Sequence, residues 1–545
     1  MGDAAAAPVG TLGYGSPGTV QAGSREMPPW SRADLPDAPR FTWRNWVGLL
    51  GPGILMGGAS IGGGEWLLGP SVTARYGAGL LWLATLSIVF QVFYNLEVSR
   101  YALYTGEPIF TGKFRTMPGP RFWVVAYLFL DAGSIFPYLA ANAATPLLTA
   151  VLGHEPGKAD VLSLFGGAVT LGHTQMIRVT GVCLFLLCLV PLIFGGKIYN
   201  SIKAVLSAKV VVVLGFLLFL AVTQTTWDTW ASIIAGFFQF GTVPTGNTTT
   251  ENLFVAAYQG RPLPAIDFTH VATLAAFASI AGSGGLTNAV ISNYTRDQGW
   301  GMGRHVGAIP SIVGGHQLEL SHAGAVFDVN AETLPRWRRW LRHVRRDQIA
   351  IWMPACFVGL ALPAMLSVHF LPRGTEAKDW TAAVMTADGV SAHVAADWGA
   401  AWGRGMWYAV VLCGLLVLLP TACQTADGII RRWVDVLWTS SARLREVEPH
   451  KIKQLYFRVL VGYAVFGTIT LSLSHSPGTV VKIATNIYNF ALGISCFHTL
   501  AVNTVLLPRE LRPGWFARAG MALGGVFFVF LATVAAIQTA RQLMG

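Results

Sequence analysis

Residues 59–66 decide the fold, and they read ASIGGGEW. Three consecutive glycines stand inside an apolar run, and each costs a helix roughly 1 kcal/mol relative to alanine. Glu65 follows directly, and insertion scales put an acidic side chain at membrane depth at roughly 2.5–3.5 kcal/mol unless it has partners or water. A single glycine would indicate only close helix packing. Three glycines followed by a carboxylate predict a helix that unwinds around a functional site.

A second interruption follows at residues 281–288, which read AGSGGLTN inside another apolar run. Unwound backbone at membrane depth is tolerated only around a cavity or within buried protein. Half-helix C-termini attract cations, and half-helix N-termini attract anions. Breaks at corresponding positions of two halves are typical of inverted-repeat transporters, whose cargo site lies between the breaks.

The composition places both interruptions in a membrane protein. Of the 545 residues, 53% are hydrophobic and only 12% are charged, about half the share of a globular domain. Lipid solvates such a surface, whereas a soluble enzyme would need more charge. The sequence contains no Walker A, HExxH or GxSxG motif, so we expect neither an ATP-driven pump nor an enzyme, and no cofactor.

Eleven apolar stretches are long enough to cross a bilayer, which takes about 20 residues. The chain is therefore predicted to be an all-α membrane protein of about 11 helices with a 5+5 inverted repeat. We expect a disordered cytosolic tail over residues 1–43, a single transporter domain over 44–545, repeats over about 45–225 and 270–507, and an extra helix at 517–543. The stretches are 45–74, 78–104, 122–151, 179–197, 202–225, 270–295, 348–371, 406–430, 455–474, 478–507 and 517–543.

The distribution of Lys and Arg predicts the orientation. With the N-terminus inside, 27 of the 38 basic residues fall on the cytosolic side and 9 outside, while Arg100 and Lys209 lie within spans. This split follows the positive-inside rule and indicates an integral protein of the plasma (inner) membrane with its C-terminus outside. Topology thus explains the net charge of +11, and we expect no nucleic-acid partner.

The segment Arg336–Arg346 reads RWRRWLRHVRR and is a basic amphipathic helix. Trp337, Trp340 and Val344 share one face of this helix, together with Leu341. The pattern predicts a helix that lies flat on the cytosolic leaflet of the bilayer, with its arginines at anionic headgroups.

Other polar residues inside the spans are candidates for the same site. Asp131 is the costliest to bury, and a carboxylate in a dry site can load and release a proton, so we expect a proton pathway through Asp131. Arg458, at the start of span 9, is assigned to the same pathway by the family resemblance described below. Each Asn or Gln taken alone is better explained by hydrogen bonding between helices. The candidate substrate-binding residues are Gly62, Gly63, Gly64, Glu65, Ser283, Gly284, Thr287, Asn288, Gln424 and Asn489.

The first two spans resemble the Nramp (natural resistance-associated macrophage protein) family of divalent-metal transporters. The likeness is carried by residues 51–53 (GPG), 59–66, 76–82 (YGAGLLW), Ser99-Arg100 and Thr105-Gly106. It implies a LeuT-like fold, proton coupling, and a metal site between spans 1 and 6.

The departures from the family lie at that metal site. Where the family has Asp-Pro-Gly-Asn in span 1, this chain has Gly62–Glu65, and where it has Met-Pro-His in span 6, the matching stretch is about Gly284–Leu286. Asp131 resembles the family's span 3 aspartate of the proton route, with Ser134 in place of the companion glutamate. Gln424 falls near its span 8 glutamine, and Arg458 near its span 9 arginine.

Three functions are compatible with this pattern. The first is proton-coupled symport of a divalent metal cation bound by Glu65, with a preference for hard ions such as Mg²⁺ or Mn²⁺ because the thioether ligand is absent. The second is transport of an amino acid or another small organic solute on the same fold. The third is a membrane receptor or assembly protein that transports nothing, which the costly charges inside the membrane disfavour.

Overall fold

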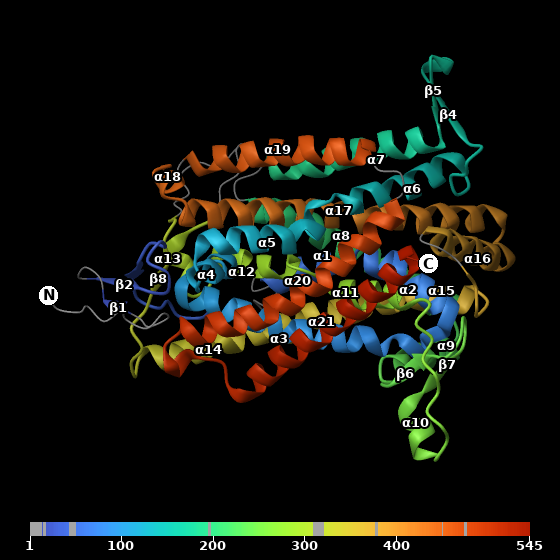
Figure 1. Ribbon diagram of the computed structural model, residues 1–545. Helices are drawn as coiled ribbons and strands as arrows, with labels where there is room; N and C mark the ends of the chain where they lie inside the picture. The colour runs from blue at the N-terminus through green and yellow to red at the C-terminus, as the bar shows by residue number, and fades with distance from the viewer. Residues whose placement is uncertain are drawn as a thin grey trace.

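The computed structural model describes residues 13–14, 18–42, 51–194, 198–308, 321–376, 380–448, 451–473 and 477–544. Most of its helices run lengthwise, side by side (Figure 1). The long helices are α3 Trp82–Thr105, α5 Pro120–Ile135, α6 Tyr138–Leu152, α7 His173–Leu189, α8 Ile198–Gln224, α15 Met353–Phe370, α16 Trp380–Trp398, α17 Ala400–Ser440, α19 Ile452–Leu473, α20 Pro477–Val505 and α21 Trp515–Met544. The shorter helices are α4 Ile109–Arg115, α9 Trp227–Gly236, α10 Leu253–Tyr258, α13 Gly303–Val306, α14 Thr333–Asp347 and α18 Ala442–Arg445.

Both predicted breaks are present. The first apolar stretch forms α1 Pro52–Ser60, an interruption, a π-helical turn η2 Gly64–Leu68 and then α2 Gly69–Tyr76. The sixth forms α11 Val271–Ile280, an unwound segment, a 3₁₀ turn η6 Thr287–Val290 and then α12 Ile291–Asp297. The unwound segment contains Gly282, Gly284 and Gly285, all with positive φ, a region of backbone conformation that favours glycine.

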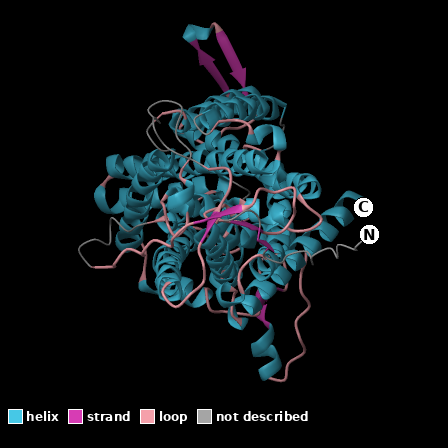
Figure 2. Ribbon diagram, turned by 90° about the vertical axis from the view of Figure 1, so that its left-hand side faces the viewer, coloured by secondary structure: helices cyan, strands magenta, loops and turns pink. Residues whose placement is uncertain are grey.

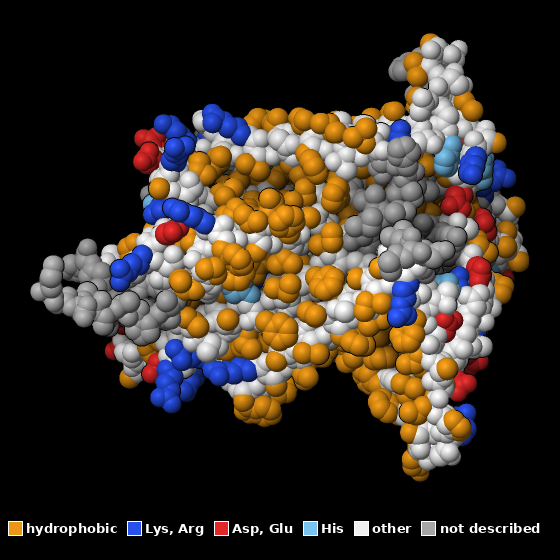
Figure 3. Space-filling view, viewed as in Figure 1, with side chains coloured by type: hydrophobic (Ala, Val, Ile, Leu, Met, Phe, Trp, Pro, Cys, Tyr) orange, Lys and Arg blue, Asp and Glu red, His pale blue; other side chains and the backbone are white. Residues whose placement is uncertain are grey.

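The protein is an integral membrane protein. Seven helices among the described residues are long and apolar enough to span a bilayer, or up to eight if the bent pair Pro52–Leu80 and Trp82–Thr105 counts as one span. Within the described residues, helices make up most of each of the eleven predicted stretches, including the two broken ones. Figure 3 shows a broad band of apolar side chains around the middle of the bundle, with Lys and Arg gathered toward its ends.

Two spans differ in detail from the prediction. The third divides into α5 and α6 at Phe136–Pro137, because proline lacks an N–H and restricts the residue before it. The eighth is a helix of 41 residues, α17, which extends beyond the predicted 406–430 at both ends. Its N-terminal extension packs against α16, a helix that the hydropathy pattern did not identify as a span.

The predicted disordered tail is wrong for residues 18–42, which we call the N-terminal strap. Its strands β2 Thr19–Gln21 and β3 Trp30–Arg32 form a sheet with β1 Gly13–Tyr14 and with β8 Ala325–Val326, which belongs to the segment before α14. Figure 2 shows this sheet lying across one end of the helix bundle. Trp30 and Leu35 are fully buried, which gives the strap the apolar anchors that its Ala- and Pro-rich composition concealed.

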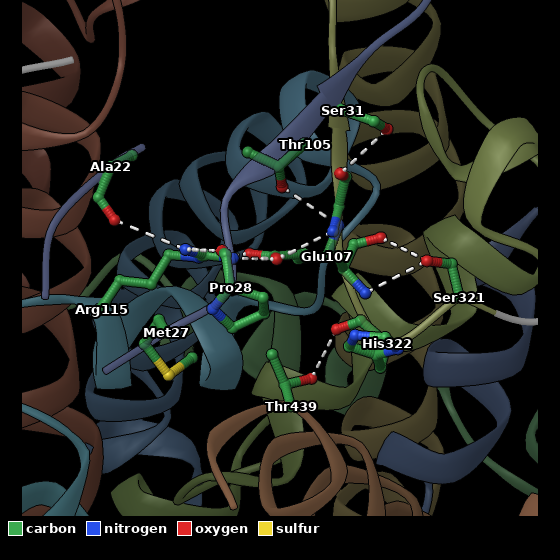
Figure 4. A network of polar contacts seen from close by, with 12 residues as sticks. Ala22, Met27, Pro28, Ser31, Thr105, Glu107, Arg115, Ser321, His322 and Thr439 are labelled. Carbon is green, nitrogen blue, oxygen red and sulfur yellow. Dashed lines mark hydrogen bonds and ion pairs between the residues drawn. The ribbon is translucent and has the colours of Figure 1, made fainter. Parts of the chain in front are cut away.

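A buried ion pair holds the strap in place (Figure 4). Arg115 Nε donates to Glu107 at 2.8 Å, and Arg115 Nη1 donates to the carbonyl of Pro28 at 2.8 Å. The guanidinium also lies over the Trp30 ring, 4.8 Å from its centroid. Glu107 accepts the backbone N–H of Gly324 at 3.0 Å, so one pair joins α4, the strap and the segment that carries β8.

The basic segment Arg336–Arg346 is helical, as predicted, within α14. Its apolar face does not lie free for a bilayer, because Trp337, Trp340 and Val344 are buried inside the protein. Trp340 donates its indole N–H to the carbonyl of Pro36 at 2.7 Å. The prediction of a helix resting on the leaflet is therefore wrong for this face: the strap and its neighbours cover the stripe.

We expect Arg115→Ala to release the strap, since Glu107 would remain as a buried charge without its cation. Breaking a buried pair in this way costs about 3–5 kcal/mol. Trypsin should then cleave after Arg25 and Arg32 faster than in the unmodified protein, and the melting temperature should fall.

The matched control is Asp328→Ala, which removes an exposed ion pair between the strap and the same segment, Arg32–Asp328 at 2.8 Å. An exposed pair contributes about 0–1 kcal/mol, so this variant should melt close to the unmodified protein. Equal protease resistance of Arg115→Ala and Asp328→Ala would contradict the assigned role of Arg115.

Candidate functional site

A small cavity of about 30 Å³ lies where the two breaks meet. That volume is sufficient for a water molecule, since about 10–15 Å³ is the minimum. The break of the first helix contributes Ser60 and residues 62–65, and the break of the sixth contributes Gly282, Ser283 and Thr287. Helices α6, α17 and α20 complete the wall with Tyr138, Leu139, Thr421, Gln424, Thr425 and Tyr488.

Glu65 is the acidic side chain of this cavity, and it is 1% exposed. It accepts the backbone N–H of Gly62 at 2.9 Å and that of Gly282 at 3.4 Å. One carboxylate therefore accepts an N–H group from each broken helix, as predicted for an anion at unwound backbone. The side chain that was predicted to bind cargo also bridges the two breaks.

Gln91 of α3 satisfies the rest of the second break. Its Oε1 accepts the backbone N–H of Ser283 at 3.0 Å and that of Gly284 at 3.3 Å. Its Nε2 donates to the carbonyl of Ala281 at 2.7 Å. A side-chain amide carries the same donor and acceptor as a peptide group, so Gln91 replaces the helical partners that residues 281–284 lack.

Lys209 of α8 places a buried ammonium group at the first break. The residue is 4% exposed, and Nζ donates to the carbonyl of Ile61 and, at 2.5 Å, to the hydroxyl of Thr421. The first break therefore holds one acidic and one basic side chain, Glu65 and Lys209.

The structure brings together most of the predicted substrate-binding residues. Gly62, Gly63, Gly64, Glu65, Ser283, Thr287 and Gln424 line the cavity. Three others lie outside its lining. The Asn288 side chain donates to Gln91 at 2.6 Å, Asn489 donates to the carbonyl of Ala275 at 3.0 Å, and Gly284 turns the backbone with φ 66°.

Sequence reasoning missed Lys209, Gln91, Tyr138 and Tyr488. Lys209 had a clear signal, because a charge in mid-span is costly and needs a partner. Gln91 carried a weaker signal, because one polar side chain among apolar neighbours is usually explained by a hydrogen bond between helices. The tyrosines carry no such signal, since aromatic residues are common throughout the spans.

The two residues assigned to a proton pathway lie in different environments. Asp131 is fully buried and pairs with Arg432, whose Nε donates to it at 2.9 Å, and Trp433 donates its indole N–H to the same carboxylate at 2.8 Å. Arg458 is exposed on α19. The cation that faces Asp131 is therefore Arg432 of α17.

The atoms around the cavity that could coordinate a metal ion are almost all oxygen atoms. Among the described residues, no group of three or more His, Cys, Asp or Glu side chains could hold a metal ion. A hard cation entering here would find Glu65, hydroxyls, the Gln424 amide and backbone carbonyls. It would also meet the positive charge of Lys209.

The comparisons with known proteins agree with this architecture. No protein-family model and no curated protein sequence matches the chain. Among solved structures, a manganese transporter of Eremococcus coleocola in complex with an aromatic bis-isothiourea compound has a TM-score of 0.54 at 12% identity, covering 92% of this chain and 88% of that one. A mutant of the same transporter gives a TM-score of 0.55 at 12% identity with the same coverage. Likeness at this identity shows the fold, so the predicted Nramp-like, LeuT-type fold is confirmed.

The close approach of the two breaks makes Gly64 sensitive to substitution. A Cβ at this position would lie 2.5 Å from Ile280 Cγ1, at the end of α11. We expect Gly64→Ala to force the breaks apart, to cost about 1–3 kcal/mol through overpacking and to abolish cargo binding. Thermal melting of the purified protein measures the cost.

Gly215→Ala is the matched control, since this exposed glycine lies inside α8 and its added Cβ would have no neighbour within 4 Å. Alanine favours a helix over glycine by about 1 kcal/mol, so the control should be neutral or slightly stabilising. A Gly64→Ala variant that melts as high as Gly215→Ala would show that the breaks are not packed as described.

Proposed function

We propose that the chain is a secondary transporter whose cargo is a small, net-neutral organic solute with hydrogen-bonding groups, with zwitterionic amino acids as the first class to test. The observation that carries the proposal is that a basic side chain stands at the same break as the acidic one: Glu65 accepts the N–H of Gly62, and Lys209 Nζ donates to the carbonyl of Ile61. Broken helices with a cavity between them are the cargo site of transporters built on this fold.

Charge balance favours such a solute over a bare metal ion. A divalent cation in a buried site needs negative charge from its ligands, because leaving water costs it far more than a neutral solute. Lys209, a basic side chain bound at the same break, opposes the entry of such a cation. A neutral or zwitterionic cargo adds no net charge. The wall offers it hydroxyls from Ser60, Thr287 and Thr421 once the two breaks move apart, because the cavity of about 30 Å³ has room for a water molecule and not for a solute of this size.

Transport of a hard divalent cation is the second candidate, and the all-oxygen lining favours it. In that case Lys209 must lose its proton or move away when the cation enters. The two candidates therefore predict opposite effects of removing the lysine charge, and the choice between them is experimental.

The decisive experiment measures the melting temperature of the purified protein with amino acids, other neutral polar solutes, Mg²⁺ and Mn²⁺. A ligand that binds the native state stabilises it by about 2.7 kcal/mol at a hundred times its Kd. We expect stabilisation by members of the organic panel and none by the divalent cations, followed by uptake of the same solute into proteoliposomes.

Lys209→Met is the matched control for this panel, because it keeps much of the side-chain length and removes the charge. The site then has the net charge of Glu65, so divalent cations should stabilise this variant more than the unmodified protein. Stabilisation of the unmodified protein by Mg²⁺ or Mn²⁺, lost in Glu65→Gln, would replace the proposal by the second candidate. A protein that binds and transports neither class is not a transporter of the kind proposed.

We propose further that transport is coupled to protons and that Asp131 carries the proton. The group is buried on α5, and its partner Arg432 donates to the carbonyl of Leu286, the residue before Thr287 of the cavity wall. Its pairing with Arg432 means that release or uptake of a proton must change the contact between α5 and α17. A change in the contact between two helices is how a transporter can open and close access to its cargo site.

Asp131→Asn alone leaves Arg432 buried without its partner, which destabilises the protein by about 3–5 kcal/mol. A loss of transport in this variant could then result from unfolding and not from the loss of the proton carrier. The test therefore uses the double variant Asp131→Asn/Arg432→Gln, which removes both charges. We expect this variant to fold and the pH dependence of solute uptake to become flat. An unchanged pH profile in the folded double variant would remove Asp131 from the proton route.

The orientation with the N-terminus in the cytosol also remains a proposal. It is supported by the Lys and Arg side chains at the end of the bundle that carries the strap, α14 and α18 (Figure 3). Helix α4, which carries Arg115, lies at this same end.

A further inference from the structure

Lys209 is unusual because its ammonium group binds a backbone carbonyl at a helix end inside the helix bundle. It sits at the C-terminal end of α1, where the helix stops and its last carbonyls have no helical partner. Carbonyls at such an end attract positive charge. The ammonium of Lys209 reaches them from a third helix, α8, and binds the carbonyl of Ile61.

The oxygen atoms around this ammonium form a cluster. The Thr421 hydroxyl, which accepts from Lys209 at 2.5 Å, lies 3.3 Å from the carbonyl oxygen of Ile61 and 3.4 Å from that of Ala59. Two backbone carbonyls and one hydroxyl, with Glu65 nearby, are the ligand types that hard cations prefer. The cluster joins the end of α1 to the middle of α17, which belong to different halves of the predicted repeat.

We propose that Lys209 is a tethered cation that occupies a cation site between α1 and α17, so that the transport cycle needs no free sodium ion there. The inference rests on the proposed transport function, which it deepens by naming what takes the place of a coupling metal ion. The lysine is a positioning residue: it holds the broken end of α1 against α17 and balances the charge of Glu65.

A purely structural lysine would make a different prediction. If Lys209 only filled space and paired with Glu65, its removal would lower stability and no ion would restore it. If it stands in for a cation, truncation should leave an oxygen-lined gap that a small monovalent cation can fill. The difference is specific recovery by an ion, which loss of packing does not produce.

The experiment measures the melting temperature of purified Lys209→Ala as sodium chloride replaces choline chloride at constant ionic strength. We expect the melting temperature of Lys209→Ala to rise with the sodium concentration. We expect no such dependence for the unmodified protein, whose site is occupied, or for Lys209→Met, whose side chain fills the gap and offers no ligand. Adding Thr421→Val to Lys209→Ala should remove the response, because one oxygen of the cluster is then lost.

Two results would overturn the inference. One is a Lys209→Ala variant whose melting temperature does not rise with sodium, lithium or potassium. The other is specific stabilisation of the unmodified protein by sodium, since a site already filled by Lys209 cannot bind the ion. This second measurement needs no variant, so it can overturn the inference even where Lys209→Ala fails to fold. Neither measurement uses a cargo, so the proposed solute can fail while the tethered cation stands.

Discussion

Backbone groups inside a membrane must all find a partner, and this constraint organises the centre of the molecule. Two helices stop in mid-membrane, at Ser60 and at Ile280, and side chains from several helices satisfy the backbone groups that the breaks expose. Glu65 accepts N–H groups from both breaks, Gln91 serves residues 281–284, and Lys209 binds the carbonyl of Ile61. Without these side chains, each unpaired group would cost several kcal/mol.

This arrangement explains how a fold shared with metal transporters can hold a site of different chemistry. The fold requires only that the backbone N–H and C=O groups at each break find hydrogen-bond partners, and different side chains can provide them. Here the protein supplies both a carboxylate and an ammonium from its own side chains. What remains for a cargo is a wall of hydroxyls and an amide with no net charge, which suits a solute that is itself neutral.

Much of the fold followed from the sequence, and for clear reasons. The first break was predictable because its three glycines disfavour a helix and Glu65 is costly to bury in lipid. The second was predictable because residues 281–288 are again rich in glycine inside an apolar stretch. The ordered strap was not predictable, because its anchors, Trp30 and Leu35, are too few to give a periodic pattern. Its partners, Arg115 and the segment before α14, are far away in the chain. The site was predicted only in part. Glu65 is a charged residue in an apolar segment, so its own neighbours in the sequence identify it. The role of Gln91 depends on which helix lies opposite, which the sequence around it does not tell.

The strap has a consequence for how the protein is made. Ser31 pairs with Gly324, a residue 293 positions further along the chain. At a synthesis rate of about 5–20 residues per second, the strap waits roughly 15–60 s after leaving the ribosome before this partner exists. Throughout that interval the end of the growing bundle stays uncovered. The sheet can therefore close only after the chain has reached Val326, when the first six predicted spans have been made and five are still to follow.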